Sequence, residues 1–177
     1  MANMSEISNR FIWSAIVQGA VLTLVTFVLF IYGSAYLTPS PAVVIASGSA
    51  GLWLMLGYVM YIIMILALGI TALFYDYIEV RLGRRLDGIS LLFAQAQLIL
   101  MNVGIFGATL LLMYAGYVGG AGLLPTALGG GGLSELQAHV QILSPFPPEI
   151  IAFVILTMLG ALCGGIAYLR ALLAKKK

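Results

Sequence analysis

The segment "FYDYIEVRLGRRLDGISLLFAQAQLILMNVGIFG", Phe74–Gly107, passes from apolar to charged and back to apolar within one short stretch. Its charged residues are Asp76, Glu79, Arg81, Arg84, Arg85 and Asp87. Only 8% of the 177 residues are charged and 62% are hydrophobic, whereas soluble domains carry about a quarter charged residues. We therefore expect a protein embedded in lipid, with this arginine-rich island in a loop between two membrane spans.

The apolar intervals on either side of the island predict four spans. No charged residue occurs between Arg10 and Asp76, and a spanning helix needs about 20 apolar residues, so this interval holds two spans. Two prolines in Leu37–Pro41 supply the turn between them. The predicted spans are 11–36, 48–75, 89–118 and 149–173. A glycine- and proline-rich loop over 119–148 joins the third span to the fourth on the outer side. We expect this loop to be irregular and mobile, with room for a short helix around Leu133–Leu143.

The whole chain, 1–177, is predicted to form a single transmembrane domain. Its first apolar run, Phe11–Leu37, is longer than the core of about 7–15 residues of a secretory signal. We therefore expect a retained transmembrane helix rather than a cleaved signal.

The basic residues predict the orientation of these spans. With four spans, all eight Lys and Arg residues fall on one side, which the positive-inside rule places in the cytoplasm. The fold class is therefore predicted as an all-α integral membrane protein with four transmembrane helices and both termini cytoplasmic, multi-pass in the cell membrane. Arg81, Arg84 and Arg85 are expected to anchor the inner loop at anionic lipid headgroups.

Small and polar residues within the spans predict where helices meet. Helices in lipid associate by close packing at small residues and by hydrogen bonds between polar ones. Intramembrane polar side chains include Gln18, and Gln95 and Asn102 are seven residues apart, so they share a helix face. We expect these amides to form interhelical hydrogen bonds, with lining of a quinone pocket or water path as the sharper alternative. The predicted helix-packing or partner-contact residues are Gly57, Gln95, Gln97, Asn102, Gly104, Gly107, Gly160 and Gly164.

The sequence offers few groups for chemistry. The single histidine, His139, is predicted to be a solvated residue of the outer loop, and the single cysteine, Cys163, to be a packing residue. Within the four predicted spans the only carboxylate is Glu149, at the very start of the fourth, and there is no lysine. Charges deep in the membrane are typical of proton and ion pathways. We therefore expect no catalytic residue, no metal site and no cofactor bound by this chain alone. No basic stripe with interleaved aromatics suggests a nucleic-acid partner.

The stretch "ALFYDYIEVRLGRRLDGISLLFAQAQLILMNVGIFG" resembles the late helices of the catalytic subunit of haem-copper terminal oxidases. Gly83-Arg84 corresponds to the family's inner-loop pair, and Gln97–Gly104 to the opening of the next helix. The positions where the family carries haem-binding histidines fall near Gly57 and Val59, neither of which can bind iron, and the family's outer Pro-Arg-Arg segment is missing. The resemblance thus implies a metal-free relative or a partner subunit, with haem and copper held by other subunits.

These observations predict a non-catalytic, structural or accessory subunit of a membrane-embedded respiratory electron-transfer complex, most specifically a terminal oxidase. Its expected partners are other integral membrane subunits that carry haem, together with membrane lipids. The alternative is a small homo-oligomeric membrane transporter or channel, which glycine-rich spans also permit. A stand-alone membrane enzyme is the third interpretation, and it would need a reactive group that the sequence does not offer.

Overall fold

The computed structural model describes residues 5–86 and 88–173. Four of its helices are long and apolar enough to cross a membrane, and they cover Glu6–Tyr36, Ser49–Arg81, Gly88–Leu123 and Phe146–Leu173. No strand occurs within the described ranges. The prediction of an all-helical fold with four helices long and apolar enough to span a membrane is therefore confirmed for the described residues.

The elements, with η marking π-helical or 3-10 turns, follow one another along the chain. They are α1 (Glu6–Thr26), η1 (Phe27–Tyr32), α2 (Gly33–Tyr36), α3 (Pro41–Ala46), α4 (Ser49–Asp76), η2 (Tyr77–Arg81), α5 (Gly88–Leu123), η3 (Thr126–Leu128), α6 (Glu135–Ala138), η4 (His139–Leu143) and α7 (Phe146–Leu173).

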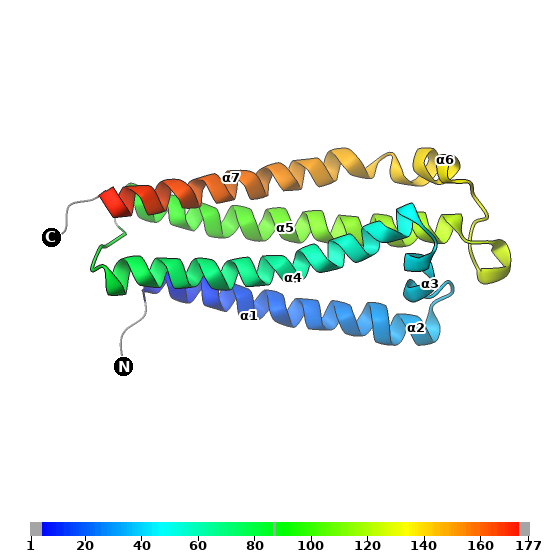
Figure 1. Ribbon diagram of the computed structural model, residues 1–177, viewed down its shortest axis with the longest axis horizontal. Helices are drawn as coiled ribbons and strands as arrows, with labels where there is room; N and C mark the ends of the chain where they lie inside the picture. Colours follow the sequence, from blue (N-terminus) through cyan, green and yellow to red (C-terminus); the bar gives the residue numbers. More distant parts are fainter. Residues whose placement is uncertain (1–4, 87, 174–177) are drawn as a thin grey trace.

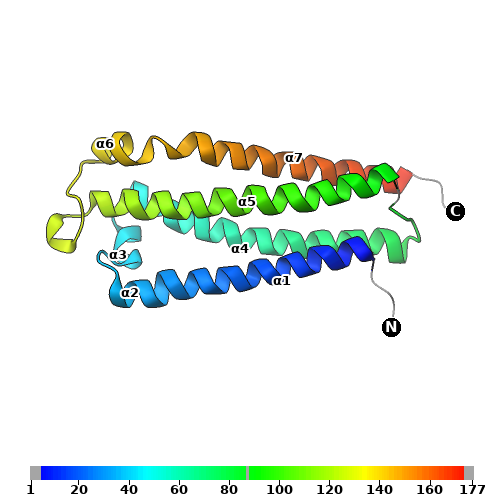
Figure 2. The ribbon, with the colours of Figure 1, turned by 180° about the vertical axis from the view of Figure 1, so that it is seen from behind.

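The long helices lie in a row in the order α1, α4, α5 and α7, with alternating direction (Figures 1 and 2). The closest packing is between α5 and α7, followed by α4 with α5 and α1 with α4. Helices α1 and α7 occupy opposite edges of the row in both views. The start of α1, the end of α7 and the α4–α5 connection meet at one end, which we call the arginine end (Arg10, Arg81, Arg84, Arg85 and Arg170).

The buried face of each inner helix repeats at three- and four-residue spacing. On α4 the buried residues include Leu54, Gly57, Tyr61, Met64 and Leu68. On α5 the corresponding series contains Ala94, Gln97, Met101, Gly104 and Ala108. This spacing is the one that antiparallel helices crossing at a shallow angle use to interdigitate side chains. Glycines within both series let the helix backbones approach closely, which is the main source of helix association in lipid.

The helices are longer than the predicted spans. Helix α1 begins at Glu6 instead of residue 11, because Ser5 caps it by accepting a hydrogen bond from the Ser8 N–H at 3.1 Å. Helix α5 continues to Leu123 instead of 118, so its 36 residues measure about 54 Å, against a hydrocarbon core of about 30 Å. Hydropathy marks the part of a helix that lies in lipid, whereas helix ends are set by capping outside it. Helix α3 was not predicted from the sequence.

The predicted outer loop, 119–148, is shorter and more ordered than expected. It spans 124–145 and contains η3, α6 and η4. The N–H groups of Gly131 and Leu133 donate to the carbonyls of Ala121 and Gly122, at 3.0 and 2.9 Å. The glycine run thus folds back and satisfies backbone carbonyls that the last turn of α5 leaves unpaired. The predicted short helix around Leu133–Leu143 corresponds to α6 and η4, which follow a capping box at Ser134.

Candidate functional site

Polar side chains meet in the membrane-spanning part of the protein, between α1 and α5. The Asn102 Oδ1 atom accepts hydrogen bonds from Ser14 Oγ at 2.6 Å and from Gln18 Nε2 at 3.0 Å. Its Nδ2 atom donates to the Leu98 carbonyl at 2.7 Å, one turn back on α5. Each of these side chains is partly buried.

Helix α4 completes this group through Tyr61, whose side chain is fully buried. The Tyr61 hydroxyl donates to Gln18 Oε1 at 2.6 Å, and the ring meets Phe106 edge-on with centroids 6.0 Å apart. Ser14, Gln18, Tyr61 and Asn102 therefore form a hydrogen-bonded group across three helices, which we call the central polar cluster. All four side chains are neutral, so the cluster can orient helices or hold a polar ligand but carries no fixed charge.

The central polar cluster borders an open groove on the side of the protein, between α1 and α5. Cavities follow one another along this α1–α5 groove. The first, of about 260 Å³, is lined by Val17, Gln18, Val21, Asn102, Val103 and Phe106. The second, of about 340 Å³, lies nearer the end opposite the arginine end and is lined by Leu24, Val25, Val28, Leu29, Leu110, Met113, Tyr114 and Tyr117.

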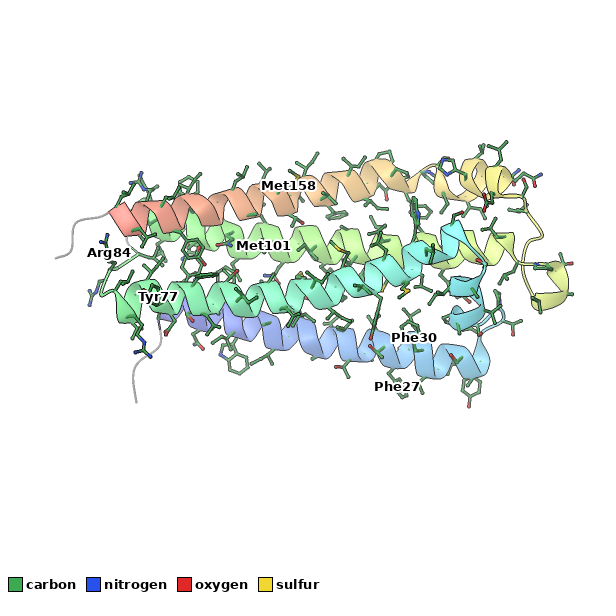
Figure 3. The ribbon with its side chains drawn as sticks, viewed as in Figure 1. Phe27, Phe30, Tyr77, Arg84, Met101 and Met158 are labelled. Atoms are coloured by element: carbon green, nitrogen blue, oxygen red, sulfur yellow. The ribbon has the colours of Figure 1, made fainter. Side chains whose placement is uncertain are left out.

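The outward and inward sides of α1 differ along this second cavity. Figure 3 shows Phe27 on the outward side of η1, where it is 53% exposed. Phe30 lies on the side facing α4 and meets Tyr58 edge-on at a centroid distance of 5.1 Å. The Tyr58 hydroxyl is 2.8 Å from Thr26 Oγ1. Helix α1 is thus fixed to α4 in this region, whereas its side toward α5 remains open.

A second polar contact lies closer to the arginine end. The Tyr75 hydroxyl donates to Gln97 Oε1 at 2.6 Å, and both side chains are buried. The Tyr75 ring stacks on Tyr168 of α7 with centroids 4.5 Å apart. Tyr168 in turn donates to the Thr71 carbonyl at 3.2 Å. These contacts connect α4, α5 and α7 in a closely packed region that borders neither of the two cavities of the α1–α5 groove.

The predicted packing glycines lie where helices approach one another. A Cβ atom at Gly57 would meet the Thr109 carbonyl oxygen at 2.7 Å, which places Gly57 at the α4–α5 contact. At the α5–α7 contact, Gly104 and Gly107 face Phe153, with Gly104 also against Thr157. On the α7 side of the same contact, two further glycines pack against α5.

These two are Gly160, which faces Met101, and Gly164, which faces the Gln97 amide. The structure therefore gives all five predicted glycines an intramolecular neighbour. Their predicted contact with another subunit stays a prediction.

The three predicted amides do not act together. Gln97 faces α4 and α7, whereas Gln95 and Asn102 both face α1, as their seven-residue spacing indicates. Gln95 lines a small cavity of about 60 Å³ with Glu6 and Arg10. There, Arg10 Nη2 and Glu6 Oε1 form an ion pair at 2.6 Å.

The predicted inner-loop arginines lie at the arginine end of the bundle. The Arg84 guanidinium donates to the carbonyls of Ala171, at 3.3 Å, and Leu172, so it caps the last turn of α7 (Figure 3). Arg81 and Arg85 are exposed. Lys175–Lys177, which contribute to the predicted charge asymmetry, lie outside the described residues.

Sequence reasoning missed three of the hydroxyl donors in these contacts. Tyr61 and Tyr75 lie on the buried stripe of α4. Tyr61 is three residues before Met64 and Tyr75 is seven residues after Leu68, so helical spacing could have identified both. Ser14 carried no comparable signal, because a lone serine in a membrane helix more often bonds to its own backbone.

The other singled-out residues do not assemble into a reactive site. His139 is exposed and borders a cavity of about 420 Å³ with Ser49 and Glu135 at the end of the bundle opposite the arginines. Cys163 is half-buried on α7. Within residues 5–86 and 88–173, no three His, Cys, Asp or Glu side chains are grouped so that they could hold a metal ion. Comparison with family models, with curated proteins and with solved structures yields no match.

Proposed function

We propose that this chain is a non-catalytic membrane subunit that binds another integral membrane protein through the outward face of α7. The observation that carries the proposal is a second pair of small residues, Ala161 and Gly165, next to the pair that packs on α5. Both are exposed, and a Cβ atom at Gly165 would meet nothing within 4 Å.

The two pairs differ by one residue, which rotates them by about 100° around the helix. Gly160 and Gly164 bring α7 close to α5, where they are buried. Ala161 and Gly165 present a second shallow surface on the exposed side of α7, between exposed Met158, which Figure 3 labels, and exposed Leu169. Exposed apolar side chains alone need no partner in lipid. A shallow strip between larger side chains, however, favours the close approach of another helix.

We further propose that the arginine end faces the cytoplasm, at the cell membrane. The five described arginines gather at the end where both described chain ends lie, and cytoplasmic loops carry the excess of basic residues. Assignment of the complex to a respiratory terminal oxidase follows only from the sequence resemblance. In that assignment, haem and copper belong to the partner subunits.

Copurification tests the subunit proposal. The tagged chain is extracted in a mild detergent and its associated proteins are identified, alongside the Gly165→Leu variant and a Gly69→Leu control. Gly69 on α4 also has open space at its Cβ position. We expect a membrane partner with the wild type and with Gly69→Leu, and its loss with Gly165→Leu. A wild-type chain that elutes alone contradicts the proposal, and a partner complex without haem absorbance contradicts only the oxidase assignment.

The alternative function, a homo-oligomeric transporter or channel, is favoured by one observation. The central polar cluster lies in the membrane-spanning region and borders an open groove, so a second copy of the chain could enclose a polar path there. Purified protein in liposomes that conducts a solute, together with an elution mass of several copies, would replace the subunit proposal with this one.

A further inference from the structure

Two amide N–H groups of the central polar cluster have no hydrogen-bond partner among the described residues. Each primary amide carries two donor hydrogens. Gln18 uses one of them on Asn102, and Asn102 uses one on the Leu98 carbonyl. Both amide oxygens already accept, from Tyr61 and from Ser14 and Gln18 respectively. The unused donor hydrogens of the cluster are therefore these two, and a ligand that pairs them must supply an acceptor atom.

Both amides line the cavity of about 260 Å³ between α1 and α5. The rest of its lining is apolar and includes the Phe106 ring, against which a flat group can pack. In hydrocarbon no water satisfies an unpaired donor, and leaving one unsatisfied costs about 1–3 kcal/mol. An acceptor oxygen in this cavity would remove that cost.

The apolar cavity of about 340 Å³ lies next along the same two helices. Helices α1 and α5 both run away from the arginine end, so the lining residues follow in register. Val21 is one turn before Val25, and Phe106 is one turn before Leu110. A ligand with its polar group at the cluster can therefore extend a long apolar tail along the same groove, past η1.

The depth of the central polar cluster in the membrane limits which polar group a ligand can place there. The first spanning helix has 31 residues, so it is about 46 Å long, about 16 Å more than the hydrocarbon core. With the helix centred in the bilayer, the core begins about 8 Å from Glu6, and Gln18 lies about 10 Å inside it. Phospholipid headgroups and ester groups stay near the interface, and no charged side chain lies in this cavity to hold an anionic one.

We propose that this groove binds an isoprenoid quinone. One ring carbonyl oxygen accepts hydrogen bonds from Gln18 Nε2 and Asn102 Nδ2, the ring packs against Phe106, and the isoprenoid tail occupies the apolar cavity. A quinone carbonyl supplies the acceptor that these two N–H groups lack. The site lies between α1 and α5, away from the outward face of α7, so it does not depend on the proposed partner.

Fluorescence quenching of Trp13 tests the proposal directly. Trp13 lies one turn before Val17 on α1, and the other tryptophan is removed by Trp53→Phe. The purified chain in dodecyl maltoside is titrated with ubiquinone-2, a benzoquinone with two isoprene units. We expect a saturable component of quenching and a lowered carbonyl stretching frequency of the bound quinone in the infrared spectrum. Quenching that rises linearly without saturation, as simple partition into micelles gives, overturns the proposal.

Three variants separate the site from a general effect on the fold. Asn102→Leu removes a donor, and Val103→Phe fills the cavity while leaving every hydrogen bond of the cluster in place. Gln95→Leu is the matched control, because Gln95 lies on the same face of α5 but outside this cavity. We expect binding to weaken by about tenfold in Asn102→Leu, as the loss of one hydrogen bond implies, and by at least as much in Val103→Phe, because the new ring occupies the space of the ligand. Binding should be unchanged in the control. Unchanged binding in Val103→Phe refutes the site.

Ethyl oleate distinguishes the ring from the tail. It carries an ester acceptor and a long apolar chain but no ring. We expect it not to displace ubiquinone-2 at equal concentration. Displacement at equal concentration would show that the groove selects any apolar chain with an acceptor, and would overturn the assignment to a quinone.

Discussion

Replacing Gly104 with alanine tests the α5–α7 contact, the closest in the row of helices. An added Cβ atom would lie 2.6 Å from the Thr157 backbone nitrogen and 2.7 Å from the Phe153 carbonyl oxygen. These are backbone atoms of α7, and Thr157 Oγ1 also donates to the Phe153 carbonyl at 3.1 Å. The clash therefore cannot be relieved by turning a side chain, and the two helices must separate.

The expected loss of stability follows from two opposing effects. Overpacking of a well-packed contact costs about 1–3 kcal/mol, and a contact between backbones places Gly104→Ala near the upper value. Alanine in a helix is more favourable than glycine by about 0.5–1 kcal/mol. The variant should thus lose about 2 kcal/mol of unfolding free energy, whereas Gly69→Ala, with nothing within 4 Å of its Cβ position, should gain about 0.5–1 kcal/mol.

The assay is equilibrium unfolding in mixed micelles of dodecyl maltoside and SDS, followed by the reaction of Cys163 with a thiol-reactive dye. Cys163 is the single cysteine of the chain and lies on α7, so its reactivity reports the separation of this helix. Gly104→Ala should unfold at a lower SDS fraction than the wild type, and Gly69→Ala at the same or a higher one. If the two variants unfold together, the close backbone contact between α5 and α7 is refuted.

Two further variants test the polar contacts. Tyr61→Phe removes the hydroxyl that donates to Gln18 at 2.6 Å, and it should lower the unfolding free energy by about 0.6–1.7 kcal/mol, as for hydrogen bonds between membrane helices. Tyr77→Phe, which changes an exposed ring, should leave the unfolding free energy unchanged. Equal effects of the two variants would contradict the contact. Arg84→Ala should increase amide hydrogen exchange in the last turn of α7, because the guanidinium caps carbonyls of that turn. Arg85→Ala should leave this exchange unchanged. Equal exchange in both variants would show that the cap does not stabilise the end of α7.

The number and approximate positions of the membrane-spanning helices could be predicted from the sequence because charge is confined to a few short segments. The island around Arg84 has to lie in water, and the apolar length on either side fixes how many helices fit. The helix ends could not be predicted in the same way. Ser5 caps α1 and the glycine run after η3 caps α5, and both depend on local hydrogen bonds that hydropathy does not register.

The choice of neighbours within the membrane was harder to predict, because the long helices are apolar on all sides. An amphipathic stripe that points to the core of a soluble protein is absent in such helices. Glycine spacing identified Gly104 and Gly164 as packing positions, but it did not indicate which of two adjacent small pairs on α7 would face α5. The central polar cluster needed the relative height of three helices, which no single segment of the sequence contains.

Cysteine labelling in intact cells tests most directly that the protein has four spans with the arginine end in the cytoplasm. Two variants are made in a Cys163→Ser background, so that each carries a single cysteine. Arg85→Cys places it in the α4–α5 connection, and Glu135→Cys places it at the opposite end of the bundle. Intact cells that express each variant are then treated with a membrane-impermeant thiol reagent. We predict that the cysteine of Glu135→Cys is labelled from outside, and that of Arg85→Cys only after the cells are opened. Labelling of both from the same side, or the reverse pattern, would contradict this topology.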